Sequence, residues 1–277
     1  MRRSNAEIAD EWRGAAWLPY TWRRASNQAG AIDRFVDGEG GGLKVHSDNL
    51  PGRVCYLKPR WKSVTVQRAA REKIASDLAY DLELSIPPVI LADRGDAGAE
   101  ERHVAVSLVM FPRQDSWEVV RRQIERGAES APIYLRSLPE ASARAWAFDT
   151  WLGQADHTDA NPHNIIFGYD PEDLDGTGCF IFLDYAFSMG HLDSWRGERM
   201  DQCAPAPLPE LMKQKVDKVA LSQAIAGIEA FDELSIRGIV ERIPVSHLSD
   251  EQKSLIIEGL GRRRRLVREA FQKELPS

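Results

Sequence analysis

The chain has 277 residues, of which 36 are Lys or Arg and 42 are Asp or Glu, so its formal net charge is −6. Hydrophobic residues make up 43% and charged residues 28%, which is the composition of a globular protein and excludes wholesale disorder, a collagen helix or a coiled coil. The length suffices for one large domain or for two lobes. The mildly acidic balance argues against nucleic-acid binding by the whole surface, although a local basic patch is compatible with it.

The cysteines and the apolar segments indicate the compartment. Cys55, Cys179 and Cys203 lie far apart and form no Cys-x-x-Cys pair, which argues against a disulfide framework or a structural zinc site. The first residues run into Asp10 and Glu11 without an apolar segment, so we expect no signal peptide. No apolar run approaches the roughly 20 residues of a membrane-spanning helix. We expect a cytoplasmic protein with no membrane partner.

The first third of the chain predicts a small antiparallel sheet and one helix. The expected strands cover residues 30–36, 43–45, 53–58, 89–91 and 103–111. Between the third and the fourth, small or apolar residues recur every four positions from Val66 to Leu82, which predicts a helix with one buried face. Pro87 and Pro88 cannot continue that helix, and Pro112 after the last strand is a candidate hinge.

After Pro112 the pattern becomes helical. The expected helices cover residues 117–127, 141–152, 213–230 and 250–275, with a short apolar strand at 180–183. The basic run Arg262–Arg265 is expected to be a solvated turn of the last helix. This order predicts an α+β protein with a β-rich N-lobe (1–112), a mostly helical C-lobe (113–277) and a cleft between them.

Residues 148–167 carry the polar side chains best suited to chemistry. Phosphoryl transfer requires a group that orients or deprotonates the acceptor hydroxyl, together with oxygen ligands for Mg²⁺. Asp156, Asn161 five residues later, and Asp184 at the end of an apolar strand supply that set. We therefore predict Asp156 as the catalytic residue and Asn161 and Asp184 as metal ligands.

The neighbouring histidines, His157 and His163, are expected to be loop residues that hydrogen-bond the backbone. No His-Glu-x-x-His motif occurs and no cysteine is close to them in the sequence, so transition-metal binding is not expected.

The segment from Phe148 to Asn161, Phe-Asp-x-Trp-Leu-x-Gln-x-Asp-His-x-x-x-Asn, resembles a signature of HipA-like and phosphatidylinositol-3/4-kinase-like kinases. That signature reads Phe-Asp-x-x-Ile-x-Asn-x-Asp-Arg-x-x-x-Asn. The segment is closest to the HipA-like branch, whose loop runs Asp-Arg-Thr-x-x-Asn-Pro and is matched by Asp156, Thr158, Asn161 and Pro162. Phe-Leu-Asp-Tyr-Ala-Phe around Asp184 is similar to the family's metal-binding strand end, Ile-Asp-x-Gly.

Two upstream segments resemble the same family. Residues 54–59 are similar to the strand of the phosphate-binding lysine, which implies that Lys58 binds the phosphates of ATP. Residues 71–79 are similar to the helix whose glutamate pairs with that lysine, which gives this role to Glu72. Gly30 stands in the position of a phosphate loop and is a candidate ATP-binding residue. Four motifs in the family's order imply a bilobal protein-kinase-like fold.

A second pair of residues has the same spacing as Asp156 and Asn161 and is an alternative to them. Asp159 and Asn164 repeat the Asp-x4-Asn spacing three residues later. The spacing from the Phe-Asp-x-Trp motif that ends at Trp151 favours Asp156 and Asn161.

The chain departs from the family at three places. His157 replaces an arginine, residues 185–187 replace the usual residues after the metal aspartate, and no Gly-x-Gly-x-x-Gly loop is present.

The resemblance implies an ATP- and Mg²⁺-dependent phosphotransferase, similar to HipA-like serine/threonine kinases, that moves the γ-phosphate to a hydroxyl on a protein. The departures motivate an alternative, a catalytically degenerate binding or scaffold module, and nucleotidyl transfer is a third hypothesis. The acceptor and any protein partner, an antitoxin included, are left open.

Overall fold

The structure is a computed structural model that describes residues 4–18, 20–24, 43–58, 67–93, 103–170, 178–189 and 202–275. The strand expected at 30–36, with the candidate Gly30, lies outside the described residues. The side chain of Lys58 also lies outside the described part.

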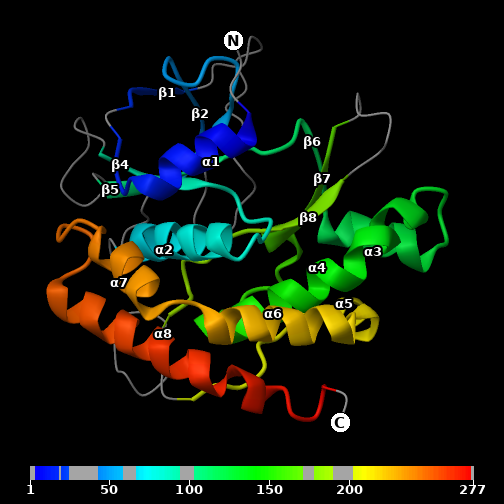
Figure 1. The fold of residues 1–277 in the computed structure, drawn as a ribbon. Helices are drawn as coiled ribbons and strands as arrows, with labels where there is room; N and C mark the ends of the chain where they lie inside the picture. Colours follow the sequence, from blue (N-terminus) through cyan, green and yellow to red (C-terminus); the bar gives the residue numbers. More distant parts are fainter. Residues whose placement is uncertain are drawn as a thin grey trace.

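The N-terminal part is built around a five-stranded antiparallel sheet (Figure 1). In spatial order its strands are β1 (Trp22–Arg24), β2 (Leu43–Ser47), β3 (Cys55–Lys58), β5 (His103–Leu108) and β4 (Val89–Asp93). Side chains alternate between the two faces, as in any pleated strand. Ile90 and Val106 belong to a smaller hydrophobic cluster, whereas Leu91 and Ala105 belong to the main core. Strands β4 and β5 are therefore buried on both faces.

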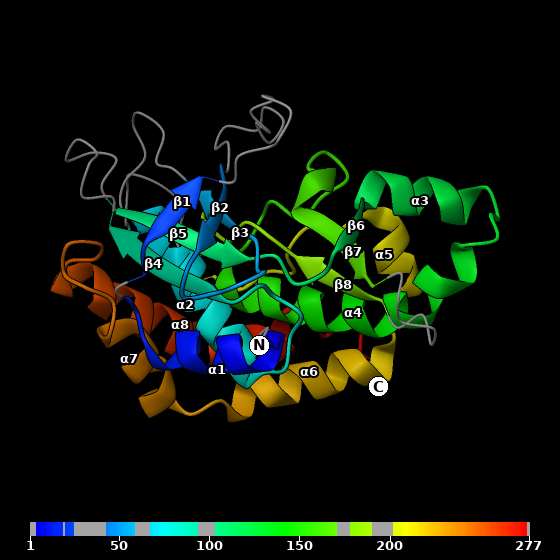
Figure 2. The same ribbon diagram turned by 90° about the horizontal axis from the view of Figure 1, so that it is seen from above.

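The C-terminal part combines a second sheet with a group of helices. This antiparallel sheet has the order β6 (Arg113–Ser116), β7 (Ile165–Tyr169) and β8 (Cys179–Phe182), and the 3-10 helix η1 (Pro162–Asn164) precedes β7. The helices are α3 (Trp117–Glu125), α4 (Ala131–Leu152), α5 (Glu210–Lys215), α6 (Lys218–Ala230), α7 (Glu233–Glu241) and α8 (Asp250–Ala270). Figure 2 shows the second sheet and α3 to one side of the five-stranded sheet. The boundary expected at Pro112 falls between β5 and β6.

Two helices accompany the five-stranded sheet. The first, α1 (Asn5–Gly14), is not predicted by the sequence analysis. It begins with a capping box, in which the Ser4 hydroxyl accepts from the Glu7 N–H and the Glu7 carboxylate accepts from the Ser4 N–H. Ile8 and Trp12 are fully buried in the smaller cluster.

The second, α2 (Gln67–Asp81), confirms the helix expected from Val66 to Leu82. Its burial differs from the expectation, because charged residues such as Arg71, Glu72 and Lys73 are buried along with its apolar face. The reason is that α2 has neighbours on several sides: β4, β5, α1 and α7 all pack on it.

The helical part corrects several boundaries. Helix α4 begins at Ala131 rather than 141, and it contains Pro139. The helix expected at 213–230 is two helices, because the Asp217 carboxylate caps a new start at Lys218. Helix α7 is an addition, and the strand expected at 103–111 ends at Leu108. None of the described helices is long and apolar enough to cross a membrane.

Candidate functional site

The candidate loop begins where α4 ends. Gly153 adopts φ +67°, the left-handed conformation that commonly ends a helix, and its N–H donates to the Thr150 carbonyl. Helix α4 is held at this end by Arg263 of α8, which donates to the carbonyls of Thr150 and Trp151. The expectation of solvated arginines is therefore wrong for Arg263, which is buried. Its guanidinium gives a partner to the Trp151 carbonyl and a further one to the Thr150 carbonyl, both in the last turn of α4.

Hydrogen bonds join this loop to the end of β8. The Gln154 side chain donates to the Asp184 carbonyl at 2.6 Å, and the Leu183 N–H donates to the Asn164 carbonyl at 2.8 Å. The Asn164 amide also makes a long, 3.5 Å, hydrogen bond to the Asp156 carbonyl. The structure thus brings Asp156, Asn164 and Asp184 into one hydrogen-bonded unit.

His157 forms the centre of this unit and is fully buried. Its Nδ1 lies 2.7 Å from Oδ2 of Asp149, and its Nε2 lies 2.7 Å from the Leu183 carbonyl oxygen. A carbonyl oxygen and a carboxylate only accept hydrogen bonds, so both ring nitrogens donate and the ring is an imidazolium. The Tyr185 hydroxyl donates to the other Asp149 oxygen at 3.0 Å.

The charge of His157 follows from its surroundings. Burial by itself lowers the pKa of His157, but the attraction of Asp149 and the hydrogen bonds to Asp149 and Leu183 outweigh it and raise that pKa. Burial, with Asp149 beside it, holds the pKa of Tyr185 well above its usual value. The expected backbone hydrogen bond of His157 is confirmed, but the buried ion pair with Asp149 was not predicted.

Asp184 follows β8 in a left-handed conformation, with φ +63°. Residues other than glycine rarely adopt this conformation, and Asp and Asn do so more readily than most. Strained backbone of this kind is concentrated at functional sites, because the surroundings must hold it in place.

Asp159, the alternative to Asp156, is engaged elsewhere. Its Oδ1 accepts from the Trp117 indole at 2.9 Å and from Arg121 at 3.3 Å, and its Oδ2 accepts from the Glu210 N–H at 3.1 Å. These bonds connect the loop to the first turns of α3 and α5. Among the amides, Asn161 is exposed and Asn164 is half-buried.

The candidate nucleotide residues lie on β3 and α2. The backbone of Lys58 pairs with Ala105 in the centre of the sheet. Glu72 is 5% exposed and close enough to Tyr185 to contribute to the rise of its pKa. Arg71 donates to the Ala186 carbonyl at 3.3 Å, so the first turns of α2 lie against the residues that follow Asp184.

Sequence reasoning missed the residues that assemble the unit, namely Gln154, Asp149 and Tyr185. Asp149 lies in the Phe-Asp-x-Trp motif, and Tyr185 is one of the departures from the family. Both residues therefore belong to motifs of the sequence, but their contact with each other arises only when the chain folds.

Comparison by sequence identifies no relative: no protein-family model and no curated protein sequence matches this chain. Solved structures do resemble it. The Helicobacter pylori proinflammatory kinase CtkA superposes with a TM-score of 0.63, over 90% of this chain and 95% of that chain, at 11% sequence identity. A Golgi casein kinase with Mn/ADP bound gives a TM-score of 0.49, over 98% of this chain and 78% of that chain, at 10% identity.

The likeness to CtkA establishes the fold. The chain has the expected α+β, protein-kinase-like fold, with an antiparallel sheet in its N-terminal part and helices in its C-terminal part. The resemblance to the HipA-like branch remains a hypothesis.

Proposed function

We propose that this protein is a phosphotransferase that uses ATP and a divalent cation, and that it moves the γ-phosphate to a hydroxyl group. The observation that carries this proposal is the hydrogen-bonded unit between the loop at 154–164 and residues 183–184. These bonds reach the backbone carbonyls of Asp156 and Asp184, and both residues are half-buried. In this proposal Asp156 orients the acceptor hydroxyl or removes its proton.

The donors around Asp184 fit magnesium. Carboxylate and amide oxygens are hard ligands, and Mg²⁺ commonly takes only one or two protein groups, its other ligands being water and phosphate. When bound, Mg²⁺ offsets the negative charge of the β- and γ-phosphates. Asp184 would hold it, together with the amide oxygen of Asn161 or of Asn164.

The remaining roles follow from the family resemblance. Lys58 would bind the α- and β-phosphates, Glu72 would hold Lys58 in place, and Gly30 would lie near the nucleotide. We further propose that the acceptor is a Ser or Thr hydroxyl of a protein, as in HipA-like kinases.

The test is transfer from radiolabelled ATP with Mg²⁺, both to the protein itself and to dephosphorylated casein. We expect incorporation of the γ-label by the wild type and none above background by Asp184→Ala. Full incorporation by Asp184→Ala would refute the site. Incorporation of the α-label instead would indicate nucleotidyl transfer. An ATP-dependent rise in Tm without any label would indicate the binding module.

The two amides can be separated by single substitutions. Because the Asn164 Nδ2 donates to the Asp156 carbonyl, its Oδ1 is left to bind a cation. We expect Asn164→Ala to lower kcat/KM by about a hundredfold, and Asn161→Ala to lower it by less than about threefold. Steady-state kinetics over a range of Mg²⁺ concentrations measure both effects. The reverse order would assign the metal to Asn161.

A further inference from the structure

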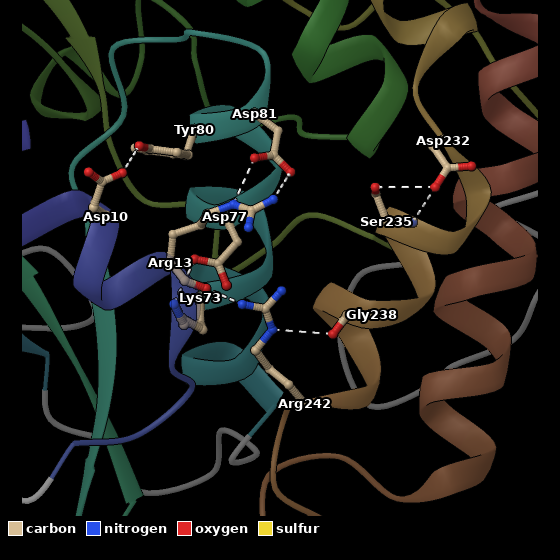
Figure 3. A network of polar contacts seen from close by, with 10 residues as sticks. All are labelled: Asp10, Arg13, Lys73, Asp77, Tyr80, Asp81, Asp232, Ser235, Gly238 and Arg242. Carbon is tan, nitrogen blue, oxygen red and sulfur yellow. Dashed lines mark hydrogen bonds and ion pairs between the residues drawn. The ribbon is translucent and has the colours of Figure 1, made fainter.

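The strongest polar cluster outside the candidate site joins α1 to α2 (Figure 3). At its centre, the fully buried Lys73 ammonium donates to the Trp12 carbonyl at 2.6 Å and to Asp77 Oδ1 at 2.6 Å. Trp12 lies in the last turn of α1, and its carbonyl also accepts from the N–H of Ala15, the residue that caps the helix, at 3.2 Å. A cation at this end also interacts favourably with the helix dipole.

Further contacts lie along the same face of α2. Asp77, Tyr80 and Asp81 follow Lys73 at helical spacing, so all four share one side of the helix. The Arg13 guanidinium binds both oxygens of Asp81, at 2.7 and 2.6 Å, and the Tyr80 hydroxyl donates to Asp10. The C-terminal half of α1 is therefore attached to α2 from Lys73, in the second turn of α2, to Asp81 at its end.

A third helix completes the cluster. Arg242, at the end of α7, donates to the Arg13 carbonyl and to the Gly238 carbonyl. Figure 3 shows Arg242 reaching from α7 toward Arg13 and Lys73. The C-terminal part of the chain thereby holds the end of α1.

Three consecutive charged residues connect this cluster to the candidate site. Successive residues of a helix point about 100° apart, so Arg71, Glu72 and Lys73 face three directions. Arg71 bonds the Ala186 carbonyl after β8, and Lys73 bonds α1. Glu72 lies between these two fixed neighbours. A rotation of α2 that turned Glu72 away would break both contacts.

We propose that Lys73 is a positioning residue: by bonding α1 it fixes the rotation of α2 and so the direction in which Glu72 points. The stability of the fold does not require a buried ion pair here, since apolar residues of similar volume often replace such pairs without loss. The kinetic test of this proposal rests on the proposed function. The test by hydrogen–deuterium exchange does not.

The test removes both charges and keeps the volume, with Lys73→Met and Asp77→Leu combined. The matched control removes the exposed i,i+4 pair of α7, with Arg237→Met and Glu241→Leu. We expect the Lys73/Asp77 variant to keep its circular dichroism spectrum. We expect its KM for ATP to rise about tenfold with kcat changed less than about twofold, because Glu72 acts through Lys58 on phosphates that bind before transfer. The control should match the wild type.

A second readout does not depend on activity. Hydrogen–deuterium exchange of the apo protein should be at least about tenfold faster across residues 67–81 in the Lys73/Asp77 variant and unchanged in the control. Unchanged exchange in that variant would overturn the proposal, and so would an unchanged KM for ATP in an active enzyme. A wild type that transfers no phosphate would refute the proposed function alone, and exchange would still decide the role of Lys73.

Discussion

Asp156→Asn is expected to lower phosphoryl transfer by about 10²–10⁴-fold, the range typical for loss of a group that orients or deprotonates a nucleophile. Asparagine keeps the size of the side chain, and the Asp156 carbonyl that Asn164 binds is a backbone group. The fold and the binding of ATP should therefore remain. Single-turnover transfer of the γ-label, with ATP binding measured by equilibrium titration, separates the chemical step from nucleotide affinity.

Asp159→Asn is the matched control in the same loop. Its carboxylate accepts from Trp117, Arg121 and the Glu210 N–H, so we expect this variant to lose about 1–2 kcal/mol of unfolding free energy. Its rate of phosphoryl transfer should fall by less than about tenfold. If Asp159→Asn abolished transfer while Asp156→Asn did not, the catalytic role would belong to Asp159, the second register of the sequence.

The sequence predicts most of the sheet and the end of α4 correctly because local signals suffice there. Strands β3 and β4 have β-branched or aromatic residues bounded by turn residues, and Gly153 marks a helix end. The start of α4 was missed because a proline such as Pro139 usually excludes the interior of a helix, whereas Pro132 lies in the first turn, where proline is tolerated. Packing of α4 against other helices and β8 outweighs that cost. Helix α1 was missed because it is short, although Ser4 and Glu7 carry the capping signal.

Burial of charge is the part that the sequence predicts least well. A run such as Arg71-Glu72-Lys73 looks like a solvated helix face, because nothing in it reveals that α1 and the residues after β8 will cover it. Tyr185 lies 36 residues from Asp149 along the chain, whereas His157 lies only eight residues from Asp149. The contact of Tyr185 with Asp149 follows from the antiparallel pairing of β7 and β8, which returns the chain to the loop after α4.

His157→Leu is expected to cost about 3–5 kcal/mol of unfolding free energy, because it leaves the Asp149 carboxylate buried without its cation. Combining it with Asp149→Leu should cost less than the sum of the two single substitutions, since the double variant buries no unpaired charge. Urea denaturation of the four proteins gives the coupling free energy. Additive losses would contradict an ion pair.

The pH dependence gives an independent check on the same residue. The pKa of His157 is raised in the folded protein, mainly by Asp149 acting against the cost of burial, so the folded state binds this proton more tightly than the unfolded state does. The stability that His157 contributes is fully present below its unfolded pKa of about 6.5, and it is lost as the pH rises through the folded pKa. The wild type should therefore lose unfolding free energy over that interval, and His157→Leu should not. Because the same imidazolium bonds Leu183, the residue before Asp184, transfer by the wild type should fall as the pH rises through the folded pKa of His157. A wild type whose stability did not change between pH 6 and 9 would show that His157 carries no proton to lose there.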